Sequence, residues 1–308
     1  MKKLLLLLIG VLLSANFFTI SANDPFRTVR VTAATIKELK VITSGGSITV
    51  RGDAGAEATV EVYVTRAKWS EEEIKAVFEE NYTVDVNLKN GCLYAVAKSK
   101  SKIKDWNKYG LNISFKISVP KNVNSNLKTS GGSITAEECN GEIFLLTSGG
   151  SIIMNNLSGN INAKTSGGSL NMNNISGYIE AKTSGGSVKA SNVNGELITG
   201  TSGGSVNLEG ISGSVKAKTS GGSMNVTVES VKEYVELSCT GGSINLTLPD
   251  GKGYDLNVKS DNNIETSGLK NFSFNGNSSN NDKVLTGTVN NGGTAINVKA
   301  PRVKLTFK

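Results

Sequence analysis

The chain has 308 residues, of which 35 are Gly and only 4 are Pro, and it contains no His. Abundant Gly without Pro excludes collagen and is not typical of disordered Gly-rich chains, which usually carry both residues. It indicates many tight turns between β-strands, because Gly reaches positive φ and Pro would remove hydrogen-bond donors from a sheet. The absence of His excludes the catalytic triads and metal sites that need imidazole, and the formal net charge is +7.

The N-terminal segment has the pattern of a secretory signal peptide. A basic start is followed by an apolar run at residues 4–13 and by small residues up to Ala22. We therefore predict a signal peptide over residues 1–22 and an exported mature chain over residues 23–308, located in the periplasm, on the outer surface or outside the cell. An uncleaved anchor is the alternative. The mature chain is not expected to span a membrane, since no later stretch is long and apolar enough.

A short string, TSGGS, recurs along the chain at a fixed spacing. Its seven copies begin at Thr43, Thr129, Thr147, Thr165, Thr183, Thr201 and Thr219, and a CTGGS variant begins at Cys239. From the second copy to the seventh, every step is 18 residues. A fixed short period of this kind is the signature of a solenoid, in which each coil stacks on its neighbour.

Within one unit, residues 147–164, apolar residues recur nine positions apart, as in Ile152 and Ile161 or Met154 and Ala163. Between these positions apolar and polar residues alternate, which indicates half-buried strands. Each 18-residue coil is therefore predicted to hold two short strands. The predicted fold is all-β: a single-domain, flattened β-solenoid, similar to a β-helix or β-roll, with a narrow apolar core.

Two other solenoids with related periods are excluded. A left-handed hexapeptide helix needs an inward residue every six positions, which the nine-residue half-period does not supply. A calcium β-roll needs Asp in its turns, and residues 126–248 contain no Asp. No metal site and no other cofactor is therefore expected.

The repeated turn residues are assigned structural roles. Paired glycines are expected in turn conformations that a Cβ would strain, and they are Gly131, Gly132, Gly149, Gly150, Gly167, Gly168, Gly185, Gly186, Gly203, Gly204, Gly221 and Gly222. Gly159 is expected to play the same part in the second turn of its coil. The Thr that opens each copy is expected to form a column whose hydroxyls bond along the solenoid. Without His, the repeated Ser are interpreted as turn residues and not as catalytic nucleophiles.

Three cysteines, Cys92, Cys139 and Cys239, are too few for a disulfide framework in a chain of this length. One bridge with one free thiol is the alternative to three buried thiols, which we expect. Cys139 occupies the position that Leu157 and Ile175 hold in the next coils, so it is interpreted as a core residue and not as a nucleophile.

Two aromatic residues of the regular coils, Phe144 and Tyr178, are predicted to point outward. A sugar ring could stack on either, but ordinary surface aromatics of strands are the favoured interpretation. Residues 126–248 contain 7 Lys, no Arg and 9 Glu. This balance argues against nucleic-acid binding, which needs a basic track.

The period is interrupted over residues 51–125, where a strand, a helix and a hairpin are expected near the N-terminal end. Ser70 and Glu73 form a capping-box pattern that predicts a helix over residues 70–80, and we expect this helix to cover the open end of the solenoid. An Asn-Gly turn at Gly91 predicts the hairpin.

Lysines alternate after this hairpin, at Lys98, Lys100, Lys102 and Lys104, with Trp106 just beyond. On a strand they would project from one face. An anion-binding patch and a charged edge that blocks sheet-to-sheet association are the two interpretations, and the charged edge is favoured because acidic residues lie nearby.

Four stretches follow one another in a characteristic order: TSGGSITV from residue 43, ISVPKNVNSNLKTSGGSI from residue 117, LTLPDGKGYDLNVKS from residue 246 and TGTVNNGGTAINVKA from residue 286. In this order, with regular coils over residues 126–248 and irregular cap coils over residues 249–308, nearly the whole mature chain resembles the bacterial family of β-strand-repeat (SGG-repeat) domains called putative adhesins. The resemblance implies a β-solenoid in a secreted or cell-envelope protein, with no catalytic residues to carry over.

These features favour a non-enzymatic module that binds an extended envelope glycan, a peptide or a protein partner. A polysaccharide-active β-helix enzyme is one alternative, disfavoured because the Glu residues of the coils are scattered and all five Arg lie outside residues 67–301. An envelope-stress sensor or scaffold is the other, and the sequence does not separate it from the first. The oligomeric state is left open.

Overall fold

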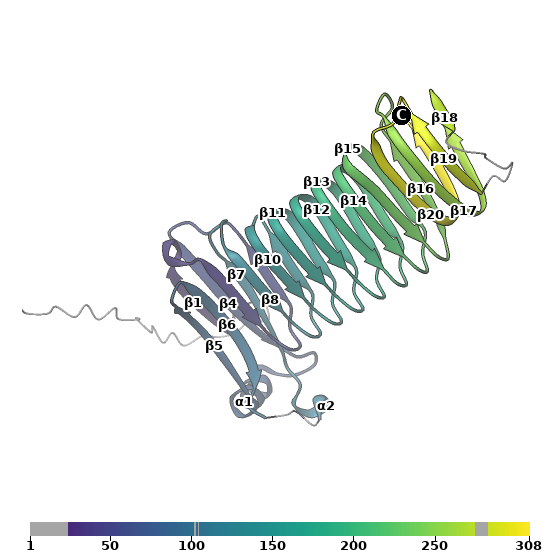
Figure 1. Cartoon of the computed structure of the whole chain (residues 1–308). Helices are drawn as coiled ribbons and strands as arrows, with labels where there is room; N and C mark the ends of the chain where they lie inside the picture. Colours follow the sequence, from purple (N-terminus) through teal and green to yellow (C-terminus); the bar gives the residue numbers. More distant parts are fainter. Residues whose placement is uncertain (1–23, 102, 104, 275–282) are drawn as a thin grey trace, which may run out of the picture.

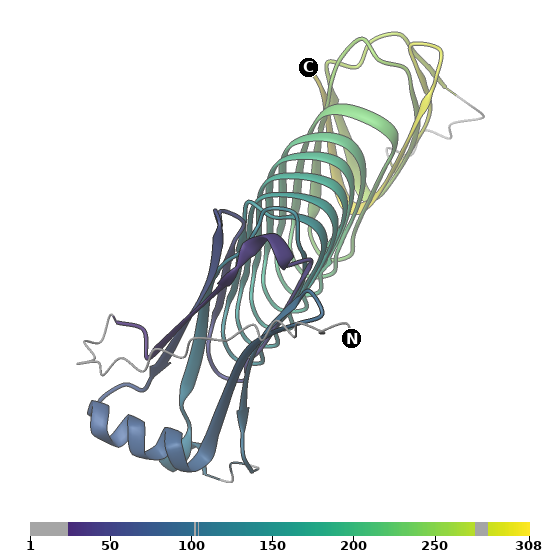
Figure 2. The ribbon, with the colours of Figure 1, turned by 90° about the vertical axis from the view of Figure 1, so that its left-hand side faces the viewer.

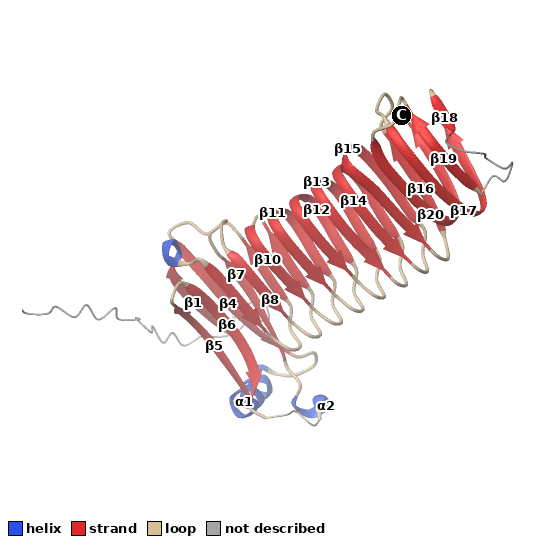
Figure 3. Ribbon diagram, viewed as in Figure 1, coloured by secondary structure: helices blue, strands red, loops and turns tan. Residues whose placement is uncertain are grey.

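The computed structural model describes residues 24–101, 103, 105–274 and 283–308, so the predicted signal peptide lies outside the described residues. Strands stack along one long axis and form an elongated β-solenoid (Figure 1). Loops gather along one edge of this stack, while strands make up its two broad faces (Figure 3). The prediction of an all-β solenoid is confirmed.

The regular coils pair in parallel and in the register that the period predicts. Their strands are β8 (Asn124–Lys128), β9 (Ile134–Glu137), β10 (Asn140–Leu146), β11 (Ile152–Lys164), β12 (Leu170–Lys182), β13 (Val188–Thr201), β14 (Val206–Thr219) and β15 (Met224–Cys239). Ile152 lies opposite Leu170, which lies opposite Val188, and both steps are 18 residues. Each coil therefore advances the chain by one strand spacing, about 4.8 Å.

Each long strand bends in its middle and so contributes to two facing sheets. The first half of β11 pairs with β9, whereas its second half pairs with β10. The bend uses Asn156 at φ 54° and Gly159 at φ 115°, values that Asn and Gly tolerate best. We call the two layers the first-half sheet and the second-half sheet. Ile152, Met154 and Ile161 point between them and are fully buried, as the alternation predicts.

The Ser-Gly-Gly turns are the loops along one long edge of the solenoid, opposite the bends of the long strands. We call this edge the turn edge. The paired glycines do not have positive φ, so the expected strain has a different cause. A Cβ on Gly150 would lie 2.1 Å from the carbonyl oxygen of Gly132 in the preceding coil, which means that the backbones approach too closely for any side chain. In the regular coils, positive φ is found instead at the glycines in the bend of each long strand, such as Gly159.

The Thr column is also built differently from the prediction. The hydroxyl of Thr147 donates to the carbonyl of Gly132 at 2.8 Å, not to another Thr, and the next coils repeat this bond. Cys239 takes the place of Thr in the last turn, and its Sγ donates to the carbonyl of Gly222 at 3.1 Å. The column thus ties each turn to the backbone of the preceding one.

The N-terminal part extends both sheets with strands of the interruption. These are β1 (Arg27–Thr32), β2 (Glu38–Ile42), β3 (Ile48–Arg51), β4 (Glu57–Thr65), β5 (Tyr82–Lys89), β6 (Cys92–Ser99) and β7 (Asn112–Ser118), with a 3-10 turn at Ala33–Thr35. On the first-half sheet the order is β9, β3, β7, β4, β1, and on the second-half sheet it is β8, β2, β6, β5. Strands β1 and β5 therefore end the two sheets.

Helix α1 (Glu71–Asn81) begins with the predicted capping box, in which Glu73 N–H donates to Ser70 Oγ at 3.3 Å and Ser70 N–H to Glu73 Oε2 at 2.8 Å. It joins β4 to β5 and crosses between the sheets at the turn edge (Figure 2). The expectation that it would cover the open end is wrong, because strands β1 and β5 form that end. A second helix, α2 (Trp106–Tyr109), lies at the same edge (Figure 1).

The C-terminal strands leave the simple winding order. They are β16 (Ser243–Leu248), β17 (Tyr254–Ser267), β18 (Phe272–Phe274), β19 (Val284–Val289) and β20 (Thr294–Phe307). Strand β20 pairs in parallel with β15 and β16 on one side and with β17 on the other, so the last strand of the chain is inserted into the stack. Strands β19 and β18 then add antiparallel pairs, which end the solenoid irregularly.

All three cysteines are buried thiols without a disulfide, as expected. Cys139 lies in the core beneath the second bend, and burial, together with the nearby acidic groups Asp53 and Glu138, raises the pKa of its thiol to about 12. Since only the thiolate reacts readily, iodoacetamide at pH 8 is expected to leave Cys139 unmodified in the folded protein and to label it after denaturation. Peptide mass spectrometry measures both, and full labelling of the folded protein would contradict the burial.

Candidate functional site

A depression with a volume of about 550 Å³ lies on the outer face of the second-half sheet, where β2, β6, β8, β10 and β11 meet. We call it the Phe144 groove. Its polar and aromatic lining residues include Glu38, Lys40, Tyr94, Asn124, Ser125, Asn126, Glu142, Phe144, Asn160 and Asn162. They come from five strands that are far apart in sequence and adjacent in the sheet.

Five of these residues form a single row across the strands. Tyr94 pairs with Lys40, Lys40 with Asn126, Asn126 with Phe144 and Phe144 with Asn162. Neighbouring members of the row are about 4.8 Å apart, the spacing of strands in a sheet. Because each residue points outward from the same register position, the row is a continuous strip of side chains.

Among the described residues, two oxygens of this row have no hydrogen-bond partner. The Oδ1 atoms of Asn126 and Asn162 are buried and unpaired, and they lie on the strands on either side of Phe144. The amide of Asn162 is oriented by a bond from Nδ2 to Glu180 Oε2 at 3.4 Å, which leaves Oδ1 free to accept. Buried acceptors without partners are uncommon in folded proteins, so these two atoms are candidate acceptors for a bound donor.

The groove also contains two aromatic rings, each with a lysine nearby, and two carboxylates. Phe144 is partly exposed, and Lys128 Nζ lies 5.1 Å from the centre of its ring. Lys40 Nζ lies 6.0 Å from the centre of the Tyr94 ring. The carboxylates of Glu38 and Glu142 flank the strip on the neighbouring row. The groove therefore combines aromatic faces with acceptors and has no excess of positive charge.

Tyr178 lies on the same face, just beyond the groove. It pairs with Asn160, a lining residue, and its side chain is 41% exposed. One strand, β11, separates it from Phe144. The two aromatic residues singled out in the sequence are thus neighbours on one surface, although only Phe144 lines the groove.

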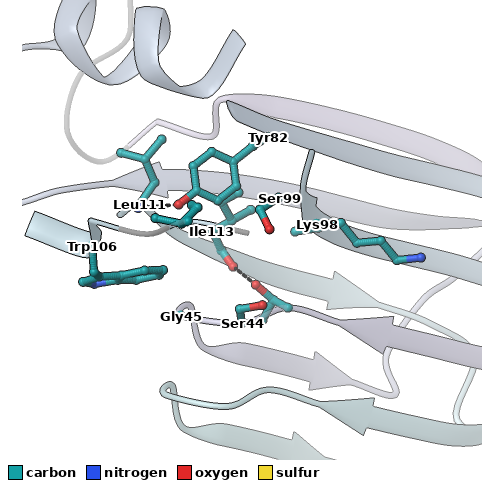
Figure 4. Close-up of a pocket in the computed structure, with 11 residues that line it drawn as sticks. Ser44, Gly45, Tyr82, Lys98, Ser99, Trp106, Leu111 and Ile113 are labelled. Carbon is teal, nitrogen blue, oxygen red and sulfur yellow. Dashed lines mark hydrogen bonds between the residues drawn. The ribbon is translucent and has the colours of Figure 1, made fainter. Parts of the chain in front are cut away.

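A second, smaller pocket lies at the turn edge of the first coil and has a volume of about 220 Å³ (Figure 4). We call it the edge pocket. It is lined by Thr43, Ser44, Gly45, Tyr82, Ala97, Lys98, Ser99, Ile103, Trp106, Leu111 and Ile113. Trp106 is 50% exposed and stands at one side of the pocket, and the Lys98 side chain extends away from it (Figure 4).

Of the four alternating lysines, Lys98 and Lys100 do not lie on one continuous strand. Strand β6 ends at Ser99, and Lys100, already beyond it, donates from Nζ to the carbonyl of Glu79 in α1. Lys102 and Lys104 lie outside the described residues. Further along the chain Asp105 caps α2, and its Oδ1 accepts from Lys108 N–H at 3.1 Å. Lys98 and Lys100 are therefore not successive outward residues of one strand.

The polar residues of the groove could not be identified from the sequence alone. Asn126 and Asn162 look like ordinary outward residues of two coils, and only the stack shows that Phe144 stands between them. Lys40 and Tyr94 belong to the interrupted part, where no period predicts their neighbours. The Asn that does recur at 18-residue steps forms a side-chain ladder from Asn192 through Asn174 to Asn156, which lies at the bend and not in the groove.

In the described part of the chain, no helix has the length and apolar character needed to cross a membrane. Within the same residues, no three acidic or thiol side chains gather closely enough to hold a metal ion.

Comparison with known proteins gives a family but no curated relative. The family model Toastrack DUF4097 matches residues 27–301. Similar solved structures include a "putative cell adhesion protein" from Clostridium sporogenes ATCC 15579, with 11% identity, TM-score 0.23 and coverage of 92% of this chain and 98% of that one. Another is a "putative adhesin" from Bacteroides fragilis NCTC 9343, with 11% identity, TM-score 0.38 and coverage of 91% and 95%. No curated protein matches the chain. With a match over most of its length, the chain belongs to the Toastrack DUF4097 family, and the resemblance that its motif order predicts is confirmed.

Proposed function

We propose that the protein is an exported, non-enzymatic, adhesin-like module that binds an extended neutral glycan in the Phe144 groove. The observation that carries this proposal is the pair of buried, unpaired oxygens of Asn126 and Asn162 on either side of the Phe144 ring. Export is supported by the signal-peptide pattern of residues 1–22.

The chemistry of the lining favours a sugar over other extended ligands. Asn126 and Asn162 offer acceptor oxygens, and the carboxylates of Glu38 and Glu142 offer more. A ligand that satisfies them must present many O–H donors, as a saccharide does. The apolar C–H face of a sugar ring packs on the exposed face of Phe144. A polyanion is disfavoured because two carboxylates line the groove.

The shape of the surface favours a chain of several sugar units. The row from Tyr94 through Phe144 to Asn162 crosses five strands at one residue per strand. Solenoids commonly bind extended ligands along such regular surfaces. Tyr178, one strand beyond Asn162, provides a further ring on the same face.

Phe144→Ala is expected to weaken glycan binding about tenfold or more, because the ring face is lost between the two acceptors. The measurement is a glycan array with the folded mature protein, followed by calorimetry with the neutral hexasaccharides that score, for example cello-, chito-, xylo- and manno-hexaose. The matched control is Ile198→Ala, since Ile198 lies in the same register row two strands beyond Asn162 and outside the groove. This control is expected to bind as the parent protein does.

Four results would overturn the proposal. Binding of none of these glycans excludes the ligand class, and equal losses in Phe144→Ala and Ile198→Ala exclude the site. Release of shorter oligosaccharides from a bound glycan, followed by chromatography, would make the protein an enzyme instead. Capture of a protein partner that Phe144→Ala fails to bind would favour the scaffold alternative.

A further inference from the structure

Lysines line up on the outer face of the second-half sheet, where its strands meet the turn edge. Register pairing joins one residue on each of nine adjacent strands, in the order Lys128, Leu146, Lys164, Lys182, Gly200, Lys218, Ser238, Lys299 and Lys259. None of these positions holds Asp or Glu. We define the lysine row by its exposed members on β11 to β20, which are Lys164, Lys182, Lys218 and Lys299.

Neighbouring strands place lysine directly beside lysine at two points. Lys164 lies opposite Lys182, and Lys299 lies opposite Lys259, so each pair is one strand spacing apart, about 4.8 Å. Like charges on adjacent strands destabilise a sheet, and these side chains are exposed and fill no core. Folding and solvation are better served by alternating charges, so the repetition of lysine points to a bound anion.

The carboxylates nearest to the lysine row are few, and each is held by a lysine. On strands β11 to β20 the register row beside it consists of Asn162, Glu180, Ile198, Lys216, Glu236 and Asn297. Glu180 Oε1 lies 2.7 Å from Lys182 Nζ, and Glu236 Oε2 lies 2.8 Å from Lys216 Nζ. The two rows together therefore carry more lysines than glutamates.

Three members of the lysine row form no ion pair. Among the described residues, no carboxylate lies within 4.0 Å of the Nζ atoms of Lys164, Lys218 and Lys299. The Ser-Gly-Gly turns that follow the strands of the regular coils contain no charged residue. The lysine row is therefore a strip of positive charge that runs along the long axis of the solenoid (Figure 1).

We propose that the lysine row binds a linear anionic polysaccharide that lies along this axis. The strand spacing of about 4.8 Å nearly equals the rise per sugar of an extended 1,4-linked uronate chain, so successive carboxylates meet successive strands. Lys164 and Lys182 then bind consecutive sugars, while Lys218 and Lys299 bind alternate ones. Gly200 and Ser238, which separate them, are small and leave room for the rings.

The surroundings of the row favour a polysaccharide over other polyanions. Single-stranded nucleic acid is disfavoured because neither register row offers an aromatic ring on β11 to β20 for bases to stack on. An anionic membrane is disfavoured because a flat surface would also meet the carboxylates of Glu180 and Glu236. A single chain, by contrast, contacts one strip of lysines.

This site does not depend on the proposed neutral-glycan site. None of the four lysines lines the Phe144 groove, and the two ligands differ in charge. Phe144→Ala is therefore expected to leave binding of the anionic polysaccharide unchanged, and loss of the lysines is expected to leave binding of neutral hexasaccharides unchanged. Either proposal can fail while the other stands.

The first test removes charge from the ligand. Calorimetry uses oligogalacturonate and oligomannuronate of about ten sugars, and the same oligomers fully methyl-esterified as neutral controls. At least one acid is expected to bind, at least tenfold more tightly than its ester, and to weaken as salt rises. Binding of neither acid, or equal binding of acid and ester, would overturn the proposal. Tighter binding to phosphatidylglycerol vesicles than to either acid would assign the row to a membrane and overturn it as well.

The second test removes charge from the protein. The row variant combines the changes at the three lysines without an ion pair, which are Lys164→Gln, Lys218→Gln and Lys299→Gln. The control removes the same charge at exposed lysines outside the row, by Lys189→Gln, Lys232→Gln and Lys304→Gln. Circular dichroism is expected to show that both fold. The row variant is expected to bind the acid at least tenfold more weakly and the control less than twofold more weakly. Equal losses would show attraction to net charge alone and overturn the proposal.

Discussion

Replacing Gly168 by Val is expected to lower the free energy of unfolding by more than about 3 kcal/mol, a large part of the stability of a typical domain. The reason is the contact between coils at the turn edge. A Cβ on Gly168 would lie 2.0 Å from the carbonyl oxygen of Gly150, a separation at which the backbone itself must move. Because the coil on the other side is equally close, with Gly186 approaching Gly168 in the same way, the turn has no free direction in which to shift.

Urea unfolding monitored by circular dichroism measures this loss, and a neighbour in the same turn is the control. At Gly167 a Cβ would meet nothing closer than 3.4 Å, so Gly167→Ala is expected to change stability by less than about 1 kcal/mol.

Gly168→Asn separates two explanations. Asn tolerates positive φ, so it would be accepted if backbone conformation were the constraint, whereas a steric constraint rejects it like Val. A stable Gly168→Asn protein would contradict the close-approach account.

The sequence predicts the effect of a side chain at Gly168 but not its physical cause. The 18-residue period predicts that a turn recurs at Gly168 and that a side chain there is harmful. It does not say whether the harm lies in φ or in the distance to the next coil, because the distance depends on how two coils stack. The Thr column has the same limit: Thr147 is correctly placed in the column, but its acceptor, the Gly132 carbonyl, belongs to another coil.

The regular core is predictable because its neighbours in space are also related in sequence. Ile152 faces Leu170 at a fixed step, so alternation and period together assign the buried positions. The period does not assign neighbours where strands leave the order of the chain. Strand β20 lies between β15 and β17, against the winding order, and no local pattern in residues 249–308 indicates that insertion.

The Phe144 groove lies at a break in the period, and this explains why the sequence did not reveal it. In the groove, Lys40 pairs with Asn126 across the whole interruption, so their contact has no sequence signal.

Deleting one whole coil is expected to destabilise the protein less than deleting half a coil. Removing residues 201–218 takes out one whole coil and joins Gly200 to Thr219, which leaves every inward position in phase. Val188 then faces Met224 directly, in place of Val206 that had separated them. Because a solenoid loses only one nearest-neighbour interface in this way, Tm is expected to fall by less than about 5 °C.

Removing only residues 201–209 deletes the Ser-Gly-Gly turn and half of the coil. Gly200, at the end of a second-half strand, is then joined to Gly210, which leads straight into another second-half strand without a turn between them. All later coils are moved half a period out of phase, so their apolar residues no longer continue the core columns. Circular dichroism and size-exclusion chromatography are expected to show an aggregated or unfolded chain without a cooperative melting transition. If the nine-residue deletion folds as well as the 18-residue one, the unit of stability is the half-coil, and the two-sheet coil described for β11 to β14 is not what holds the solenoid together.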